Sequence, residues 1–309
     1  MRIEILGSAA GGGFPQWNCG CRNCQSLRAG TFGGKGRTQT QVAITNDQTH
    51  WFLLNASPDL RLQIEAASYL HPRGGRRNSP INGVLLTSPD IDQIAGLLSL
   101  RELQPLQIYS TPSLRRILQE DNSVFGMLNR VPNQVSWQEI TIGQSFPLLG
   151  LTGAESGIRC EAFSLADGYP AYVSAQRSAT LRPEEASLGL FVGSSSGRKL
   201  AYMPAVPAID GALLQRLESV DLLLFDGTFW SDDELIQVQG SGATAHEMGH
   251  IPISGAQGSL RRLAGLQHPR KVFIHVNNTN PILDESGPQY REVCDAGWEV
   301  AADAWSLEL

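Results

Sequence analysis

Three cysteines near the amino terminus have the spacing of a metal site. Cys19, Cys21 and Cys24 form a C-x-C-x-x-C motif, and Gly20 allows a tight turn between the first two. Three thiolates in this arrangement can converge on one tetrahedral Zn²⁺. The neighbouring residues are polar, which disfavours the alternative that the three are ordinary small core residues. We therefore expect a structural zinc, with a fourth ligand from elsewhere in the chain.

A second group of candidate ligands lies at the ends of three short apolar runs. Acidic residues follow two of the runs, and a histidine ends the third. In layered α/β proteins the carboxyl ends of strands form the rim where ligands bind, so these side chains should converge on one shallow pocket. Oxygen ligands with one imidazole suit Fe(II), Mn²⁺ or Zn²⁺ with open positions. Each aspartate alone could be a helix cap or turn residue, but their coincidence favours a site. The candidates are Asp90, Asp92, Asp226 and His275.

Residues 246–250 read HEMGH and match the H-E-x-x-H pattern of zinc metalloproteases. That motif requires a helix, so that both histidines face one side and the glutamate acts as the general base. Here Gly249 lies within the motif, and Gly- and Pro-containing segments flank it, which disfavours a helix. We expect a loop in which His250, with or without His246, leans over the strand-end pocket.

Short apolar strands and amphipathic helices must position these residues. Their order predicts an α+β organisation of two sheets covered by helices, within a single domain spanning residues 1–309. Strands are expected at residues 2–6, 51–56, 83–87 and 107–110, and again from residues 188, 199, 221 and 271. Helices are expected from Pro58, over residues 91–102, after Thr111, and near Asp210 and Ser259.

Composition excludes several classes of protein. The 309 residues are 41% hydrophobic and 17% charged, and the net charge of -6 disfavours a general nucleic-acid binder. No run approaches the roughly 18 apolar residues of a membrane span, and the amino terminus lacks a secretory signal. The clustered cysteines fit reduced thiols holding a metal in the cytosol. We expect a cytoplasmic protein that binds neither nucleic acid nor membrane.

Several long stretches resemble the PqqB family of the metallo-β-lactamase superfamily, which takes part in pyrroloquinoline quinone (PQQ) synthesis. They run in order from near the amino terminus to residue 283, and LLTSPDIDQIAGLLSLRE occupies the place of the metallo-β-lactamase signature. The resemblance implies an αββα sandwich with the active site at the sheet edges. The stretches that carry it are GSAAGGGFPQWNCGCRNC, LLNASPDLRLQI, LLLFDGTFWSDDELI, MGHIPISG and FIHVNNTNPIL.

The resemblance also implies roles for particular residues. The active-site metal falls at Asp92, Gln93 and His275, with Asp226 as a bridging carboxylate and His250 as a second histidine of the pocket. Catalytic roles then belong to Asp92, His250 and His275. For the cysteine zinc, related phosphodiesterase-like members supply a histidine where this chain has Asn278, which makes Asn278 the candidate fourth ligand.

The reaction implied by the resemblance is iron-dependent hydroxylation, by O₂, of a cross-linked Glu–Tyr precursor. Gln93 departs from the family pattern, which has histidine there. An amide oxygen is a weaker ligand than an imidazole, so we expect Fe²⁺ to be weakly held or absent, and a Gln93→His change to tighten its binding. Two alternatives remain. One is a non-catalytic carrier of PQQ or an intermediate towards the periplasm. The other is a metal-dependent hydrolase, which Ser88 and Asp90 disfavour because they stand where hydrolases have histidine.

The expected ligand is a small-molecule or dipeptide-derived precursor of PQQ. Other proteins of the pathway and a second copy of the chain are the candidate protein partners.

Overall fold

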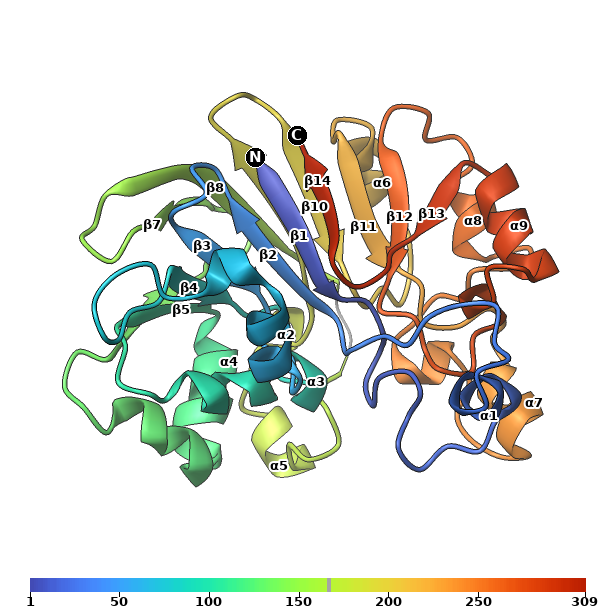
Figure 1. Cartoon of the computed structure of the whole chain (residues 1–309), viewed down its shortest axis with the longest axis horizontal. Helices are drawn as coiled ribbons and strands as arrows, with labels where there is room; N and C mark the ends of the chain where they lie inside the picture. The colour runs from blue at the N-terminus through green and yellow to red at the C-terminus, as the bar shows by residue number, and fades with distance from the viewer. Residues whose placement is uncertain (166–167) are drawn as a thin grey trace. The chain divides into compact units, whose positions relative to one another are not determined.

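The computed structural model describes residues 1–165 and 168–309, whose strands form two seven-stranded sheets (Figure 1). The first sheet has the order β14-β1-β2-β3-β4-β5-β6 and the second has the order β13-β12-β11-β10-β9-β8-β7. The first contains β1 (Arg2–Gly7), β2 (Gln41–Thr45), β3 (Trp51–Leu54), β4 (Ile81–Leu85), β5 (Leu106–Ser110), β6 (Val135–Glu139) and β14 (Trp305–Glu308). The second contains β7 (Ser145–Leu149), β8 (Glu155–Ser164), β9 (Leu188–Ser194), β10 (Lys199–Met203), β11 (Leu222–Asp226), β12 (Arg270–Ile274) and β13 (Trp298–Val300).

Both sheets mix the two strand directions. Strands β3 to β6 run parallel, whereas β2 and β3 are antiparallel. In the second sheet β10 to β13 run parallel, whereas β7 to β9 are antiparallel. Parallel neighbours bring their carboxyl ends to the same edge, which is where the candidate ligands follow the strands.

The helices are short, and several begin at polar caps or prolines. Thr111 caps the helix that starts with Pro112, and its side chain accepts a hydrogen bond from the Leu114 N–H at 3.4 Å. Asp210 accepts in the same way from Leu213 at 2.7 Å. Both starts were predicted. The α-helices are α1 (Arg22–Arg28), α2 (Leu60–Ala66), α3 (Ile91–Ile94), α4 (Pro112–Arg116), α5 (Ala175–Ser178), α6 (Gly211–Leu217), α7 (Glu234–Gln239), α8 (Ser259–Arg262) and α9 (Pro288–Asp295).

The chain divides into two compact units. The first comprises residues 1–6, 41–198 and 306–309, and its core packs buried residues of β3, β4 and β5 against helices, among them Leu53, Val84 and Ile108. The second comprises residues 7–40 and 199–305. Its core includes Phe273 and Trp298, whose rings stack with centroids 4.1 Å apart. The helix α9 lies beside β13 (Figure 1).

The helix predicted over residues 91–102 is wrong in extent. Only α3 is α-helical, and a 3₁₀ segment follows at Ala95–Leu100. The reason is a close backbone approach at Gly96, whose N–H donates to the Ala56 carbonyl at 2.8 Å. A Cβ at this position would lie 2.2 Å from the Ser57 carbonyl oxygen. The chain therefore bends here to dock α3 against the end of β3.

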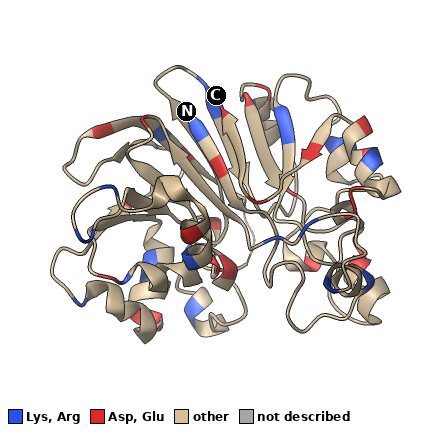
Figure 2. Ribbon diagram, viewed as in Figure 1, with Lys and Arg blue, Asp and Glu red and all other residues tan. Residues whose placement is uncertain are grey.

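Charged residues of both signs are interspersed along the described chain (Figure 2). Within residues 1–165 and 168–309, no helix combines the length and apolar character needed to cross a membrane.

Candidate metal centres

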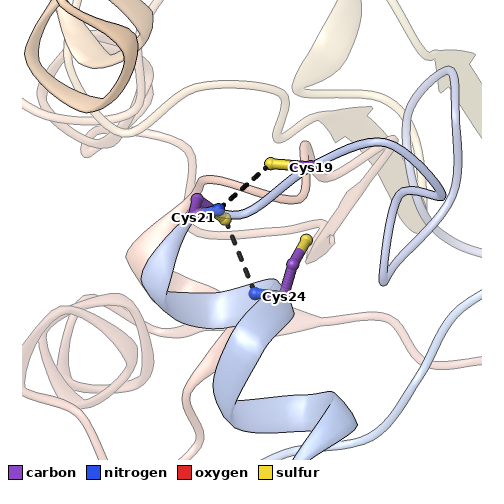
Figure 3. A group of neighbouring side chains, drawn as sticks. All are labelled: Cys19, Cys21 and Cys24. Atoms are coloured by element: carbon purple, nitrogen blue, oxygen red, sulfur yellow. Dashed lines mark hydrogen bonds between the residues drawn. The ribbon is translucent and has the colours of Figure 1, made fainter.

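Cys19, Cys21 and Cys24 lie together at the start of α1 (Figure 3). Their sulfur atoms lie within 4.8 Å of one another. The Cys21 N–H donates to the Cys19 Sγ at 3.4 Å, and the Cys24 N–H donates to the Cys21 Sγ at 3.5 Å. Hydrogen bonds of this kind favour the thiolate form. The predicted cysteine cluster is thus assembled within the second unit.

Asn278 faces all three sulfur atoms. Its Nδ2 atom lies 3.1 Å from the Sγ of Cys19, 3.7 Å from that of Cys21 and 3.4 Å from that of Cys24. The two ends of a carboxamide exchange places by a flip of the amide, so the same position can present oxygen. Three sulfurs and one amide oxygen are four donors around one point, which fits a closed tetrahedral zinc site.

The thiols of the cluster differ in acidity. Burial, together with the adjacent thiols, raises the pKa of Cys21 to about 11, even though the Cys24 N–H favours its thiolate. Burial also acts to raise the pKa of Cys19, but hydrogen bonds from Cys21 and Asn278 hold it below its ordinary value. A bound cation would keep coordinating thiols deprotonated, which offsets the cost of burying them.

Asp226, His250 and His275 come together at the carboxyl ends of β11 and β12. The two strands pair in parallel, and Asp226 lies opposite Ile274, the residue before His275. One ligand atom from each side chain lies within 4.8 Å of the others. Asp226 is fully buried, and the two histidines are 8% and 6% exposed. The structure therefore brings together three of the residues predicted for the active site.

Thr228 contacts all three members of this group. Its Oγ1 lies 2.6 Å from Asp226 Oδ1, 2.9 Å from His275 Nδ1 and 3.1 Å from His250 Nδ1. Sequence reasoning missed Thr228. The position of a threonine two residues beyond a strand-end aspartate was the only local signal, and the contact with both imidazoles arises only in the tertiary structure.

The Asp226 carboxylate accepts hydrogen bonds at both oxygens. The donors are Val206 N at 2.8 Å, Thr228 N at 3.0 Å and the Thr228 hydroxyl, and His250 Nδ1 lies 2.8 Å from Oδ2. Burial raises the pKa of Asp226, but His250, His275 and Thr228 together hold it below its ordinary value. The backbone N–H groups of Val206 and Thr228 donate to its oxygens, which favours the ionised form.

His275 has a backbone φ of 57°, in the left-handed region that residues other than glycine rarely adopt. Hydrogen bonds hold the backbone immediately after it: Val276 N donates to Ser8 O at 3.0 Å, and Asn277 N donates to Thr228 O at 3.1 Å. Backbone conformations of this kind concentrate at functional sites, where the surroundings enforce them.

As predicted, the HEMGH segment does not form the helix of a zinc metalloprotease. A 3₁₀ turn covers His246–Met248, and Gly249 ends it with a φ of 78°. His246 is exposed and contacts Asp232, with 2.7 Å between Nδ1 and Oδ1. Glu247 is also exposed, and accepts a hydrogen bond from Thr244 N at 2.8 Å. Of the two histidines in the motif, His250 alone joins the group with Asp226.

The first unit contains Asp90, Asp92 and Gln93, which follow β4. The Ser88 hydroxyl donates to Asp90 at 2.6 Å, and Asp90 does not cap α3 with its side chain. The Gln93 Nε2 donates to Asp92 Oδ2 at 3.4 Å. The structure places these residues together within their own unit, and their sharing a pocket with Asp226 stays a prediction.

A chain of buried amides fixes the orientation of Gln93. The Thr87 N–H, which can only donate, bonds to Asn55 Oδ1 at 2.8 Å, so the Asn55 NH₂ group points to Gln93. Gln93 must then turn its oxygen towards Asn55, because two facing donors would leave buried groups unsatisfied. Its NH₂ group consequently faces Asp92.

The first unit also contains an open cavity of about 730 Å³, which no motif indicated. Arg177 lies in its wall and forms ion pairs with Glu120 at 2.8 Å and Asp121 at 2.6 Å. Tyr172, also in the wall, donates a hydrogen bond to the Pro89 carbonyl at 2.5 Å. The volume is that of a small-molecule site.

Residues 50–276 match the model of the Beta-lactamase superfamily domain. Coenzyme PQQ synthesis protein B from Pseudomonas putida (strain GB-1) is 42% identical over 311 residues, covering 100% of both chains. The protein of the same name from Methylorubrum extorquens (strain PA1) is 40% identical over 310 residues, again with full coverage of both. The chain belongs to the PqqB family.

The structural comparison agrees with this membership. The crystal structure of Zn²⁺-bound PqqB from Methylobacterium extorquens superposes with a TM-score of 0.91 at 39% identity, covering 100% of both chains. A diphosphatase of the PhnP family has a TM-score of 0.67 at 18% identity, a similarity that concerns the fold alone. The predicted metallo-β-lactamase fold and the predicted PqqB family are both confirmed.

Proposed function

We propose that this member of the PqqB family acts in PQQ biosynthesis by metal-dependent hydroxylation of a cross-linked Glu–Tyr precursor. The observation that carries the proposal is the buried group of Asp226, His250 and His275. Imidazole and carboxylate are the donors of non-haem iron oxygenases, whereas an all-thiolate site would favour other metals. The full-length similarity to coenzyme PQQ synthesis proteins supports the pathway.

The residues of this centre have different roles in the proposal. His250 and His275 hold the metal, and the ionised Asp226 supplies negative charge beside them. The sequence predicts two further carboxylates for the same metal, from Asp92 and Asp90. Fe²⁺ bound at this centre would supply the activation of O₂. Burial of the group keeps bulk water away from the reacting atoms, which strengthens every electrostatic contact there.

Cys19, Cys21 and Cys24 hold a structural Zn²⁺ in this proposal, with the amide oxygen of Asn278 as the fourth ligand. The support is the contact of the Asn278 amide with all three sulfurs. A site closed by four protein donors leaves no position for a substrate, so this centre stabilises the fold and takes no part in the reaction.

The proposed reaction converts a ring C–H bond of the tyrosine into C–OH. One oxygen atom of O₂ enters the product and the other leaves as water, so a reductant must supply two electrons. The test uses the zinc-loaded chain with Fe(II), ascorbate, ¹⁸O₂ and the cross-linked precursor. We expect one ¹⁸O atom in the product. The His275→Ala variant should abolish incorporation, and His246→Ala, in the exposed histidine of the neighbouring loop, should not.

Two results would contradict the proposal. Binding of the precursor without O₂ consumption would favour a carrier, and cleavage of the precursor without O₂ would favour a hydrolase.

A further inference from the structure

The Thr228 hydroxyl lies where Asp226, His250 and His275 converge, and it has one proton to give. Its distance to Asp226 Oδ1 is 2.6 Å, shorter than its distances of 2.9 and 3.1 Å to the imidazole nitrogens. Hydrogen bonds from a hydroxyl to a carboxylate are charge-assisted and are shorter and stronger than those to a neutral acceptor. The proton therefore points to Asp226.

Asp226 cannot act as the donor in its hydrogen bond with Thr228. Its Oδ1 also faces the Thr228 N–H at 3.0 Å, and its Oδ2 faces the Val206 N–H at 2.8 Å. Backbone N–H groups can only donate, so both oxygens of the carboxylate act as acceptors. With its own proton committed, the Thr228 oxygen can only accept from the two imidazoles.

We propose that Thr228 is a positioning residue of the metal centre that holds His250 and His275 with their protons on Nδ1. A neutral imidazole carries one N–H, so Nε2 of each ring then keeps the lone pair that a metal ion requires. The inference rests on the proposed function for the use of these nitrogens as ligands, whereas the proton positions are argued from the Thr228 and Asp226 contacts.

This arrangement resembles the hydrogen bonds that orient metal-binding histidines in other proteins. A ligating histidine generally donates its other N–H to a carboxylate or a similar acceptor, which fixes the ring and its tautomer. Here the Thr228 oxygen accepts from His275, and His250 lies within reach of both the Thr228 oxygen at 3.1 Å and the Asp226 carboxylate at 2.8 Å. Loss of the hydroxyl would leave His275 Nδ1 without this acceptor, whereas His250 Nδ1 would keep Asp226 at 2.8 Å. The stronger effect should therefore appear at His275.

The first test compares Thr228→Val, which removes the hydroxyl with little change in shape, with Thr228→Ser, which keeps it. Fe(II) is titrated anaerobically into the zinc-loaded full chain. We expect Thr228→Val to bind Fe(II) about tenfold more weakly, as for other outer-shell changes, and Thr228→Ser to bind close to the parent. Thr45→Val, a buried threonine of β2, controls for the loss of any buried hydroxyl. Equal affinities for the parent and Thr228→Val would overturn the proposal.

The second test needs no iron. In ¹⁵N–¹H spectra of the zinc-loaded full chain, we expect His250 and His275 to carry their protons on Nδ1. Thr228→Ser should keep this pattern if the valine variant does not fold. A parent His275 with its proton on Nε2 would overturn the proposal. If the protons are on Nδ1 but Fe(II) does not bind, the proposed metal centre fails and the Thr228 assignment stands.

Discussion

Gln93 stands where the family resemblance expects a metal-binding histidine, yet its amide already has two partners in the fold. Its oxygen accepts from Asn55, and its NH₂ group donates to Asp92 at 3.4 Å. A metal bound through that oxygen would have to use its second lone pair, beside the hydrogen bond from the buried Asn55. The contacts of Gln93 thus favour a role in holding Asp92 over a role as a weak ligand.

This orientation makes a prediction for Gln93→His that differs from the one based on sequence. A neutral imidazole can accept from Asn55 and donate to Asp92, so it can take over both hydrogen bonds. We expect the Fe(II) affinity of the zinc-loaded variant to stay close to that of the parent in an anaerobic titration. Tightening by about tenfold or more, the gain expected of a new imidazole ligand, would show that position 93 faces the metal.

The cysteine centre has a simpler test in Cys21→Ser. The variant should lose one zinc per chain, measured by elemental analysis, because a hydroxyl replaces a thiolate ligand. Zinc binding contributes to folding, so thermal unfolding should occur at a lower temperature. Cys294→Ser is the matched control, since Cys294 is exposed and lies outside the cluster. Full zinc content in Cys21→Ser would refute the site.

At the scale of elements, α7 is hydrogen-bonded to the two turns that carry residues of both metal centres. Its first residue, Glu234, accepts from the Trp230 N–H at 2.6 Å, in the segment after β11, and from the Thr279 hydroxyl, in the turn after β12. Glu234 is 5% exposed. Burial raises its pKa from 4.5 to about 7, although the hydrogen bonds from Thr279 and Trp230 oppose the shift.

The pKa of Glu234 predicts a pH dependence of stability. Folding raises this pKa, so the carboxyl of Glu234 contributes to the stability of the folded chain. This contribution is fully present below about pH 4.5 and is lost as the pH rises through about 7. Its size is on the order of 3 kcal/mol of unfolding free energy. In chemical denaturation across this range, Glu234→Gln should lack this loss relative to the parent. The exposed Glu247→Gln should behave like the parent, and parallel pH profiles for the parent and Glu234→Gln would contradict the prediction.

The sequence predicted elements where one physical signal dominates. Strands β4, β10, β11 and β12 each contain a short apolar run, and most of their residues are buried. Strand β8 (Glu155–Ser164) escaped prediction because it includes Glu, Gly and Arg and is only partly buried. The 3₁₀ segment after α3 depends on the approach of Gly96 to another part of the chain, which no local pattern contains.

At the scale of the whole molecule, residue types predicted the metal donors, whereas the groups that orient them required coordinates. Cysteine spacing and strand-end acids are visible in one sequence. The contacts of Thr228 and Asn55 are not, because a hydroxyl or an amide has many possible partners and the fold selects among them.

The two candidate centres share one turn. His275 and Asn278 both follow β12, and Asn280 ties that turn to the segment after β11 by donating to Gly227 O at 3.0 Å and Thr228 O at 3.2 Å. A zinc held by Asn278 would therefore stabilise the backbone that presents His275. Structural zinc and active-site metal then have separate ligands but a common support.

The central claim is that His275 and His250, beside Asp226, bind the active-site metal. Its most direct test is anaerobic Fe(II) binding to the zinc-loaded parent, His275→Ala and His246→Ala chains. We predict one Fe(II) per chain for the parent and for His246→Ala, whose histidine is exposed and lies outside the group, and no binding at this centre in His275→Ala. Binding by His275→Ala with the affinity and stoichiometry of the parent would contradict the claim.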